Sequence, residues 1–140
     1  MDSRGQGKMI AVIDVSSAAQ ILLQTPKKEK FETALRKAKL ILSPDLYVSE
    51  LSNTLWKFCT KKIYSEAECL RFVEDGLGYI DSFTDSKELW KEAFGEAVKN
   101  KHPVYDMLYA VLARRNDGIL ITNDGDLAKI CEKLSIKYCF

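Results

Sequence analysis

The chain has 140 residues, a length that suits one domain with one hydrophobic core. Hydrophobic residues make up 46% of the chain and charged residues 29%, which is an ordinary globular composition. No apolar run is long enough to cross a membrane, so we expect no transmembrane segment. The net charge of +1 argues neither for nor against a nucleic-acid partner, because a local basic patch could still exist.

Residues 1–8 are polar and lack the apolar stretch of a secretory signal. We therefore expect a flexible tail over residues 1–8 and a single domain over residues 9–140. None of the four cysteines lies in a C-x-x-C pair, and the one histidine is His102. This pattern argues against a zinc site and against histidine-dependent catalysis. We expect reduced, mostly buried thiols in a cytoplasmic protein at Cys59, Cys69, Cys131 and Cys139.

The first half of the chain alternates apolar strand patterns with amphipathic helix patterns. A buried strand over residues 10–13 ends on Asp14, and Ser16 and Ser17 follow as helix-start residues. Ser65 and Glu68 form a capping-box pattern at the start of a later helix. The predicted elements after the first strand are helices over 16–23 and 27–39, a strand over 40–42, and helices over 45–60 and 65–75.

The second half of the chain continues this alternation. Residues 79–80 are a weak strand candidate. The predicted elements that follow are helices over 85–98 and 103–115, a strand over 119–121, a helix over 127–134 and a strand over 136–140. The helix over residues 85–98 has a predicted apolar face that consists of Leu89, Trp90, Ala93, Phe94, Ala97 and Val98.

Strands separated by helices predict a parallel sheet with helices on both faces, because parallel strands need crossover connections. In such a sheet the carboxyl ends of the strands and the starts of the following helices share one edge. Asp14, Glu50 and Asp124 each follow a predicted strand, so topology places them on that edge. Asp106 joins them if its helix points the same way, and Asp126 lies two residues beyond Asp124.

Carboxylates without basic partners are costly to gather, because neighbouring negative charges raise one another's pKa. A divalent cation relieves this repulsion, and oxygen ligands favour Mg²⁺ or Mn²⁺ over zinc. Such an ion can activate a water and stabilise a leaving oxygen without help from histidine or cysteine. Structural roles remain open: Asp124 could cap the last helix, Asp106 could stabilise its own helix, and Glu50 could be a solvated surface acid.

Four short segments carry these acids, in a fixed order that spans nearly the whole chain. They are Val12-Ile13-Asp14-Val15-Ser16, Ser49-Glu50-Leu51, Tyr105-Asp106-Met107-Leu108-Tyr109-Ala110 and Leu120-Ile121-Thr122-Asn123-Asp124-Gly125-Asp126-Leu127. In order, spacing and placement they resemble the motifs of the PIN-domain ribonucleases. The length of the chain is similar to that of the toxin component of bacterial and archaeal toxin–antitoxin pairs within this family.

The resemblance implies an α/β fold of three α/β/α layers, with a five-stranded parallel sheet and about seven helices. It implies Mg²⁺- or Mn²⁺-dependent hydrolysis of RNA phosphodiester bonds, and a homodimer and a small antitoxin protein as partners. Ser16 and Thr122 match family hydroxyl positions that would orient the carboxylates or a phosphate. The implied catalytic and metal-binding acids are Asp14, Glu50, Asp106 and Asp124, with Asp126 as a ligand through water or a helix cap.

The chain contains no glycine-rich nucleotide-binding motif. Basic residues such as those at 27–30 could hold RNA phosphates, although a solvated helix face is the alternative. The helices over 16–23, 27–39 and around Trp56 are plausible partner surfaces, but we expect their apolar stripes to belong to the core. The alternative function is a non-catalytic PIN-like module that binds RNA or protein as a scaffold.

Overall fold

The computed structural model describes residues 9–140, so the predicted tail over residues 1–8 lies outside the described part. Five strands and seven helices alternate within residues 9–140. In chain order they are β1 (Met9–Ile13), α1 (Val15–Leu22), α2 (Lys28–Lys37), β2 (Ala38–Pro44), α3 (Leu46–Thr60), α4 (Glu66–Gly78), β3 (Ser82–Thr84), α5 (Ser86–Asn100), α6 (Val104–Arg115), β4 (Ile119–Ile121), α7 (Gly125–Lys133) and β5 (Lys137–Cys139).

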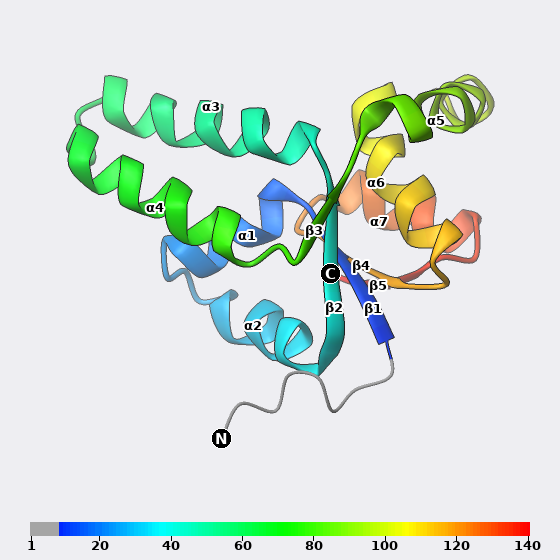
Figure 1. The fold of residues 1–140 in the computed structure, drawn as a ribbon, viewed down its shortest axis with the longest axis horizontal. Coiled ribbons are helices and arrows are strands. Elements are labelled where there is room, and N and C mark those ends of the chain that lie inside the picture. Colours follow the sequence, from blue (N-terminus) through cyan, green and yellow to red (C-terminus); the bar gives the residue numbers. More distant parts are fainter. Residues whose placement is uncertain (1–8) are drawn as a thin grey trace.

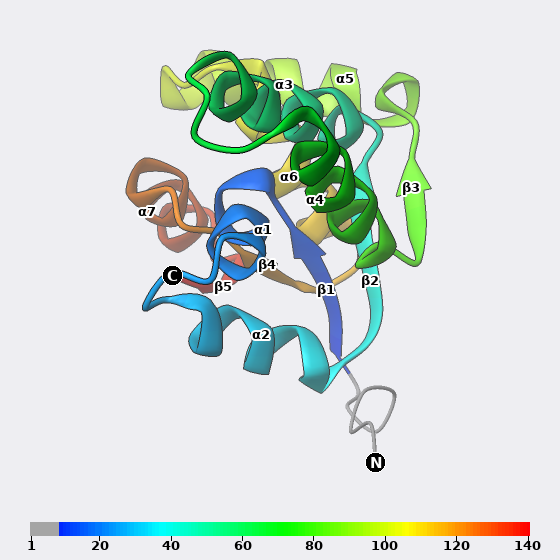
Figure 2. The same cartoon turned by 90° about the vertical axis from the view of Figure 1, so that its left-hand side faces the viewer.

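The five strands form one parallel sheet in the order β3-β2-β1-β4-β5, with β1 at its centre. Helices α1 to α4 lie on one side of the sheet and α5 to α7 on the other (Figures 1 and 2). The predicted three-layer α/β/α fold with a five-stranded parallel sheet and seven helices is therefore confirmed. No helix within residues 9–140 is long and apolar enough to span a membrane.

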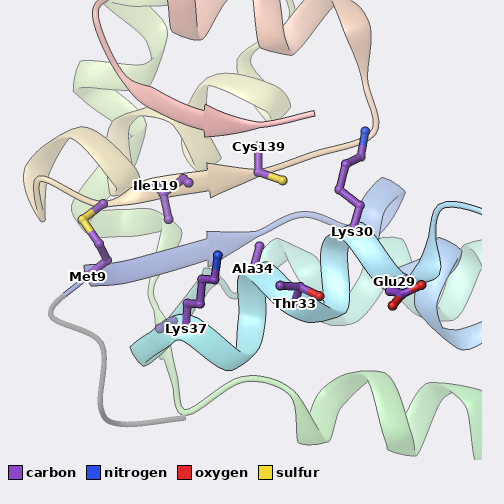
Figure 3. A pocket seen from close by; sticks show the side chains of 9 residues that line it. Met9, Glu29, Lys30, Thr33, Ala34, Lys37, Ile119 and Cys139 are labelled. Atoms are coloured by element: carbon purple, nitrogen blue, oxygen red, sulfur yellow. The ribbon is translucent and has the colours of Figure 1, made fainter. Parts of the chain in front are cut away.

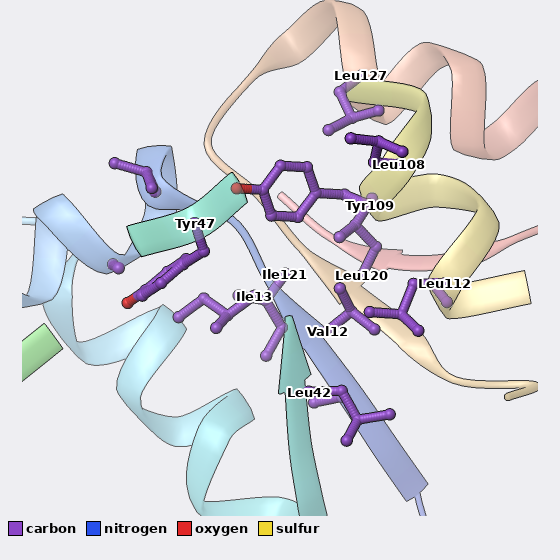
Figure 4. Packing of buried hydrophobic residues seen from close by; sticks show 14 of the residues in the cluster. Val12, Ile13, Leu42, Tyr47, Leu108, Tyr109, Leu112, Leu120, Ile121 and Leu127 are labelled. Atoms are coloured by element: carbon purple, nitrogen blue, oxygen red, sulfur yellow. The ribbon is translucent and has the colours of Figure 1, made fainter. Parts of the chain in front are cut away.

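The core surrounds the central strand. Ala11, Val12 and Ile13 of β1 are fully buried, because helices cover both faces of the sheet and strands of this kind become continuous apolar runs. Two tyrosines, Tyr47 from α3 and Tyr109 from α6, pack into this core (Figure 4). The four cysteines are all free thiols, as predicted for reduced side chains, although only two of them are fully buried.

The predicted third strand is displaced in the structure. Residues 79–80 lie in the short connection after α4, and β3 begins only at Ser82, because α4 continues through Gly76 to Gly78 instead of ending at residue 75. Gly76 serves helix packing here: an added Cβ would lie 2.6 Å from a methyl carbon of Leu51. The prediction took this glycine as a stop signal, whereas its small size lets α3 and α4 approach closely. The capping box predicted at the start of α4 is confirmed.

The apolar face of α5 is divided into two stripes. Leu89, Ala93 and Ala97 pack into the core and are at most 9% exposed. The other three residues of the predicted face lie one position further along, and successive side chains on a helix point about 100° apart. They therefore face solvent, and the prediction of one buried face was wrong for Trp90, Phe94 and Val98, which are 55%, 58% and 65% exposed. Trp56 of α3, also expected in the core, is 60% exposed.

Ion pairs hold α5 against α6. Arg114 of α6 bonds Glu96 at 2.6 Å and Glu92 at 2.8 Å, and Arg115 bonds Glu92 at 3.1 Å. Glu96 is only 6% exposed, and its buried carboxylate is compensated by Arg114 and, at 3.8 Å, by Lys99. This arrangement fixes the helix that carries Asp106.

Candidate active site

Asp14 stands at the end of β1 and caps α1. Its carboxylate accepts hydrogen bonds from the Ser17 N–H at 3.0 Å, the Ser17 hydroxyl at 3.0 Å and the Ser16 hydroxyl at 2.7 Å. The Thr122 hydroxyl, from the end of β4, also donates to Asp14. The sequence suggested that Ser16 could cap this helix, but Asp14 is the capping residue and Ser16 donates to it.

The carboxylate of Asp14 is only 6% exposed. Burial raises its pKa, although the hydrogen bonds from Thr122, Ser17 and Ser16 act in the opposite direction. These donors also fix the orientation of the carboxylate from two elements, α1 and β4. Asp14 is thus a rigidly held acid with no ion-pair partner among residues 9–140.

Glu50 lies one turn into α3, and a tyrosine from the opposite helical layer holds it. The Tyr109 hydroxyl donates to Glu50 Oε1 at 2.6 Å. Burial raises the pKa of Glu50, the hydrogen bond from Tyr109 lowers it, and the negative charges of Asp106 and Asp14 raise it again. The same environment raises the pKa of Tyr109 far above its usual range, so this hydroxyl stays protonated and continues to donate.

Asp106 lies in the first turn of α6, where it contacts the only histidine of the chain. Nε2 of His102 is 2.7 Å from Asp106 Oδ2. Burial raises the pKa of Asp106, the hydrogen bond to His102 lowers it, and the charges of Asp124 and Asp126 raise it further. Asp106 therefore lies within electrostatic reach of the turn that precedes α7, as its place on the carboxyl edge requires.

Asp124 caps α7. Its Oδ1 accepts from the N–H groups of Asp126 at 2.9 Å and Leu127 at 3.3 Å, and its own N–H donates to the Thr122 hydroxyl at 3.0 Å. The cap that the sequence left open as a structural explanation is therefore present. Oδ2 of Asp124 takes no part in the capping bonds, so capping and metal binding are compatible. Asp126 is exposed in the first turn of α7.

A group of hydroxyls joins the ends of β1 and β4. The Ser16 and Thr122 oxygens lie 3.3 Å apart, and the Ser16 hydroxyl accepts from the Asn123 N–H at 2.8 Å. The Ser17 hydroxyl donates to the carbonyl oxygen of Ile121 at 2.8 Å. Both hydroxyls that we predicted as orienting groups therefore contact Asp14 or its immediate neighbours.

The acids influence one another electrostatically, yet in this conformation they do not meet at one point. Within residues 9–140, no group of three or more Asp, Glu, His or Cys side chains is arranged to hold a metal ion. The carboxylates are instead oriented by separate hydrogen-bonding partners. The predicted ligand set of Asp14, Glu50, Asp106, Asp124 and Asp126 therefore remains a prediction.

The donor set nevertheless has the chemistry of a magnesium or manganese site. All five acids offer oxygen ligands, and no thiol stands among the groups that hold them. Within the described part of the chain, the contact between Asp106 and His102 is the one pairing of any of the five acids with a basic side chain. Burial raises the pKa of Asp14, Glu50 and Asp106, and neighbouring negative charges raise the pKa of Glu50 and Asp106 further, so a bound cation would favour their charged forms.

Three residues that hold these acids were missed in the sequence. Tyr109 was noted only within the motif around Asp106, Ser17 only as a helix-start residue, and His102 only as evidence against histidine chemistry. The spacing did contain a signal, because His102 and Tyr109 lie four residues before and three residues after Asp106. Spacing alone, however, could not show that Tyr109 reaches across to Glu50 on another helix.

A cavity also lies away from the acids. A cavity of about 490 Å³ opens between α2 and the strands β1, β4 and β5 (Figure 3). Its wall combines apolar side chains with two lysines, and none of the five acids lines it. The acids occupy the carboxyl edge of the sheet, where a long substrate can approach without entering a cavity.

Comparison with known proteins places these features in a family. A PIN-domain family model matches residues 11–133. Ribonuclease VapC3 of Pyrobaculum aerophilum is 30% identical over 123 residues, which are 86% of this chain and 94% of that protein.

Three solved structures share the fold. PAE2754 from Pyrobaculum aerophilum has a TM-score of 0.68 and 23% identity, over 87% of this chain and 79% of its own. VapBC2 from Rickettsia felis, bound to a DNA fragment from its promoter, has a TM-score of 0.64 and 14% identity, over 93% of this chain and 97% of its own. VapBC-5 from Mycobacterium tuberculosis, of the VapBC family of toxin–antitoxin systems, has a TM-score of 0.61 and 15% identity, over 93% of this chain and 97% of its own. With the family model and the VapC3 relative, these likenesses establish that the chain belongs to the PIN-domain family.

Proposed function

We propose that this protein is a divalent-metal-dependent endoribonuclease that hydrolyses RNA phosphodiester bonds. The observation that carries the proposal is the buried Asp14, whose negative charge, with that of Asp106, acts on Glu50, while no lysine or arginine is paired to any of the three in the described residues. Its relative VapC3 is named a ribonuclease, which supports the choice of RNA as substrate.

Each acid has a defined place in this proposal. Asp14, Glu50, Asp106 and Asp124 would hold Mg²⁺ or Mn²⁺, with Asp126 as a ligand through water. When bound, such ions activate a water for attack on the phosphate and stabilise the leaving oxygen. The residues of the chain prepare this chemistry by fixing the ligands. Serine and threonine hydroxyls orient Asp14, and Tyr109 and His102 restrain Glu50 and Asp106.

The first test compares RNA cleavage by the wild-type protein and by Asp14→Asn, in Mg²⁺ and in Mn²⁺. We expect Asp14→Asn to lose activity by at least about 100-fold, because the amide removes a negative ligand while nearly preserving the shape of the helix cap. Asp75→Asn, a matched change on the exposed surface of α4, should retain full activity. Equal activity of wild type and Asp14→Asn would contradict the proposal. RNA binding without cleavage in either metal would favour the scaffold function.

The second test measures metal binding by thermal unfolding. Because Asp14, Glu50 and Asp106 have raised pKa values in the folded state, the folded protein binds more protons than the unfolded chain above the usual carboxylate range. The metal-free protein should therefore lose stability as pH rises from that range towards neutrality. Saturating Mg²⁺ or Mn²⁺ should restore it and raise the Tm by about 5 °C at neutral pH.

In Asp14→Asn this metal-induced rise should shrink, whereas in Asp75→Asn it should match wild type. Sodium chloride at the same ionic strength controls for screening of the charges. A rise of equal size in wild type and Asp14→Asn would mean that the metal binds elsewhere. No rise in any variant would contradict metal binding altogether.

We also propose that the protein is the toxin of a toxin–antitoxin pair, with a small antitoxin protein as partner. Two of the structural neighbours carry the VapBC name, and VapBC-5 is described as part of such a system. The surface offered to the partner is a groove of about 260 Å³ between α3 and α4. Trp56 and Leu70 line it and are 60% and 58% exposed.

A small protein encoded directly beside this gene should, when co-expressed, co-purify with the chain and inhibit RNA cleavage. Trp56→Ala should weaken the complex by about tenfold or more, because exposed tryptophans often dominate interface energies. Phe94→Ala, an equally exposed aromatic on α5, is the matched control and should bind as wild type. Full inhibition of Trp56→Ala would place the partner on another surface, and an inert neighbour would contradict the antitoxin proposal.

We further propose a homodimer that forms through α5. Trp90, Phe94 and Val98 recur every four residues and form an exposed apolar stripe on this helix. A stripe on one helix can pair with its own copy across a twofold axis, which buries both copies at once. Because α5 is ion-paired to α6, the dimer would also brace the helix that carries Asp106.

Light scattering after gel filtration should give the wild-type protein the mass of a dimer and Phe94→Glu the mass of a monomer. The Tm of the Phe94→Glu monomer should stay within a few degrees of wild type, since the side chain is 58% exposed in the single chain. Trp56→Glu, on α3, should remain dimeric. The opposite pattern, a monomeric Trp56→Glu and a dimeric Phe94→Glu, would assign the interface to α3, and a monomeric wild type would contradict the dimer.

A further inference from the structure

The last described residue, Phe140, lies directly beside the acidic edge. The Thr122 N–H donates to the carbonyl oxygen of Cys139 at 3.0 Å, which holds the end of β5 against the end of β4. Beyond it, the Phe140 ring packs over Gly125, where an added Cβ would lie 3.5 Å from the ring. Gly125 separates Asp124 from Asp126, and the ring remains partly open, with Phe140 47% exposed.

Two lysines from the start of α2 surround this ring. The ammonium groups of Lys27 and Lys30 lie 5.8 Å and 5.9 Å from the ring centroid, within the range of cation–π attraction. Lys30 also donates to the main-chain oxygen of Phe140 at 2.5 Å, and Lys27 donates to the side-chain oxygen of Asn123 at 2.9 Å. Figure 2 shows the end of the chain beside the turn between α1 and α2, where these lysines begin the helix.

The charges of these two lysines are available to a ligand. Within residues 9–140, neither Lys27 nor Lys30 forms an ion pair with a carboxylate, and both are exposed. Lys27 is nevertheless tied to the site, because Asn123 donates its N–H to the same Ser16 hydroxyl that contacts Asp14. Phe140, Lys27 and Lys30 therefore form one surface, the lysine–phenylalanine platform, that adjoins the acids.

The platform has what the acidic edge lacks for binding RNA. Carboxylates repel a polyanion, so affinity must come from cations close by. Proteins that bind single strands combine such cations with aromatic rings on which bases stack. We propose that the platform binds a nucleotide of single-stranded RNA next to the cleaved bond. Its base stacks on the open part of the Phe140 ring, and its phosphate lies by Lys27 and Lys30.

This inference rests on the proposed function for its substrate, so its test separates binding from cleavage. Binding of a short, fluorescein-labelled single-stranded RNA of mixed sequence is measured by anisotropy in EDTA, over a series of salt concentrations. Phe140→Leu should bind about tenfold more weakly with an unchanged salt slope, because it loses stacking and no charge. Phe140→Trp should bind as well as wild type.

Lys27→Gln should reduce the slope of log K against log salt by about 0.7, the value for one phosphate contact on a single strand. Phe83→Leu is the aromatic control, on β3 at the opposite end of the sheet, and Lys39→Gln is the charge control, near the amino end of β2. Both controls should bind with wild-type affinity and salt slope. Unchanged Tm values verify that each variant folds.

Wild-type binding by Phe140→Leu, or an unchanged salt slope for Lys27→Gln, would overturn the platform. Failure of the proposed function is distinguishable from this outcome. If wild type cleaves RNA but Phe140→Leu binds normally, the platform is wrong and the nuclease stands. If Phe140→Leu and Lys27→Gln bind as expected but no metal supports cleavage, the platform stands and the nuclease is wrong. If the platform binds a partner protein and not RNA, all variants should bind RNA with equal affinity, which would also overturn the proposal.

Discussion

The structure depends on a carboxylate placed where the most buried strand ends. β1 lies at the centre of the sheet, so Asp14 reaches the carboxyl edge with almost no exposed surface. Burial disfavours the charged form, and only directed hydrogen bonds oppose it. Those bonds come from Ser16, Ser17 and Thr122, and they tie β1, α1 and β4 at one point. The same contacts therefore cap a helix, join two strands and orient an acid.

The other acids follow a similar rule. Each carboxylate is held by a hydrogen-bonding partner that does not fully neutralise its negative charge. Glu50 accepts from the neutral Tyr109 hydroxyl, and Asp124 accepts from backbone N–H groups. Asp106 contacts the His102 ring nitrogen. Lysine and arginine are used elsewhere, above all in the ion pairs between α5 and α6. The fold thus keeps negative charge uncompensated at one edge, at a cost in stability that a bound cation would offset.

Much of this could be predicted from the sequence, because strand periodicity and topology are local signals. The alternation of elements predicts the parallel sheet, and the sheet places Asp14, Glu50 and Asp124 on one edge. Side-chain partners across elements were not predictable, so the hydrogen bond from the Tyr109 hydroxyl to Glu50 was missed. Exposure was misjudged where apolar residues adjoin, as with Leu89 and Trp90 on α5. A residue pattern cannot show which of two adjoining apolar side chains packs into the core and which faces solvent.

The two ends of the acidic edge are built differently, and this difference gives the site a direction. At one end, Glu50 of α3 is influenced by the negative charges of Asp106 and Asp14, and α3 and α6 lie on opposite sides of the sheet (Figure 1). At the other end, Asp124 adjoins an aromatic ring flanked by two lysines. A polyanion is repelled at the first end and attracted at the second, unless metal ions reverse the sign at the first. RNA that is held by cations on the platform would therefore reach the carboxylates only as these acquire their own cations, which couples substrate binding to metal binding by charge alone.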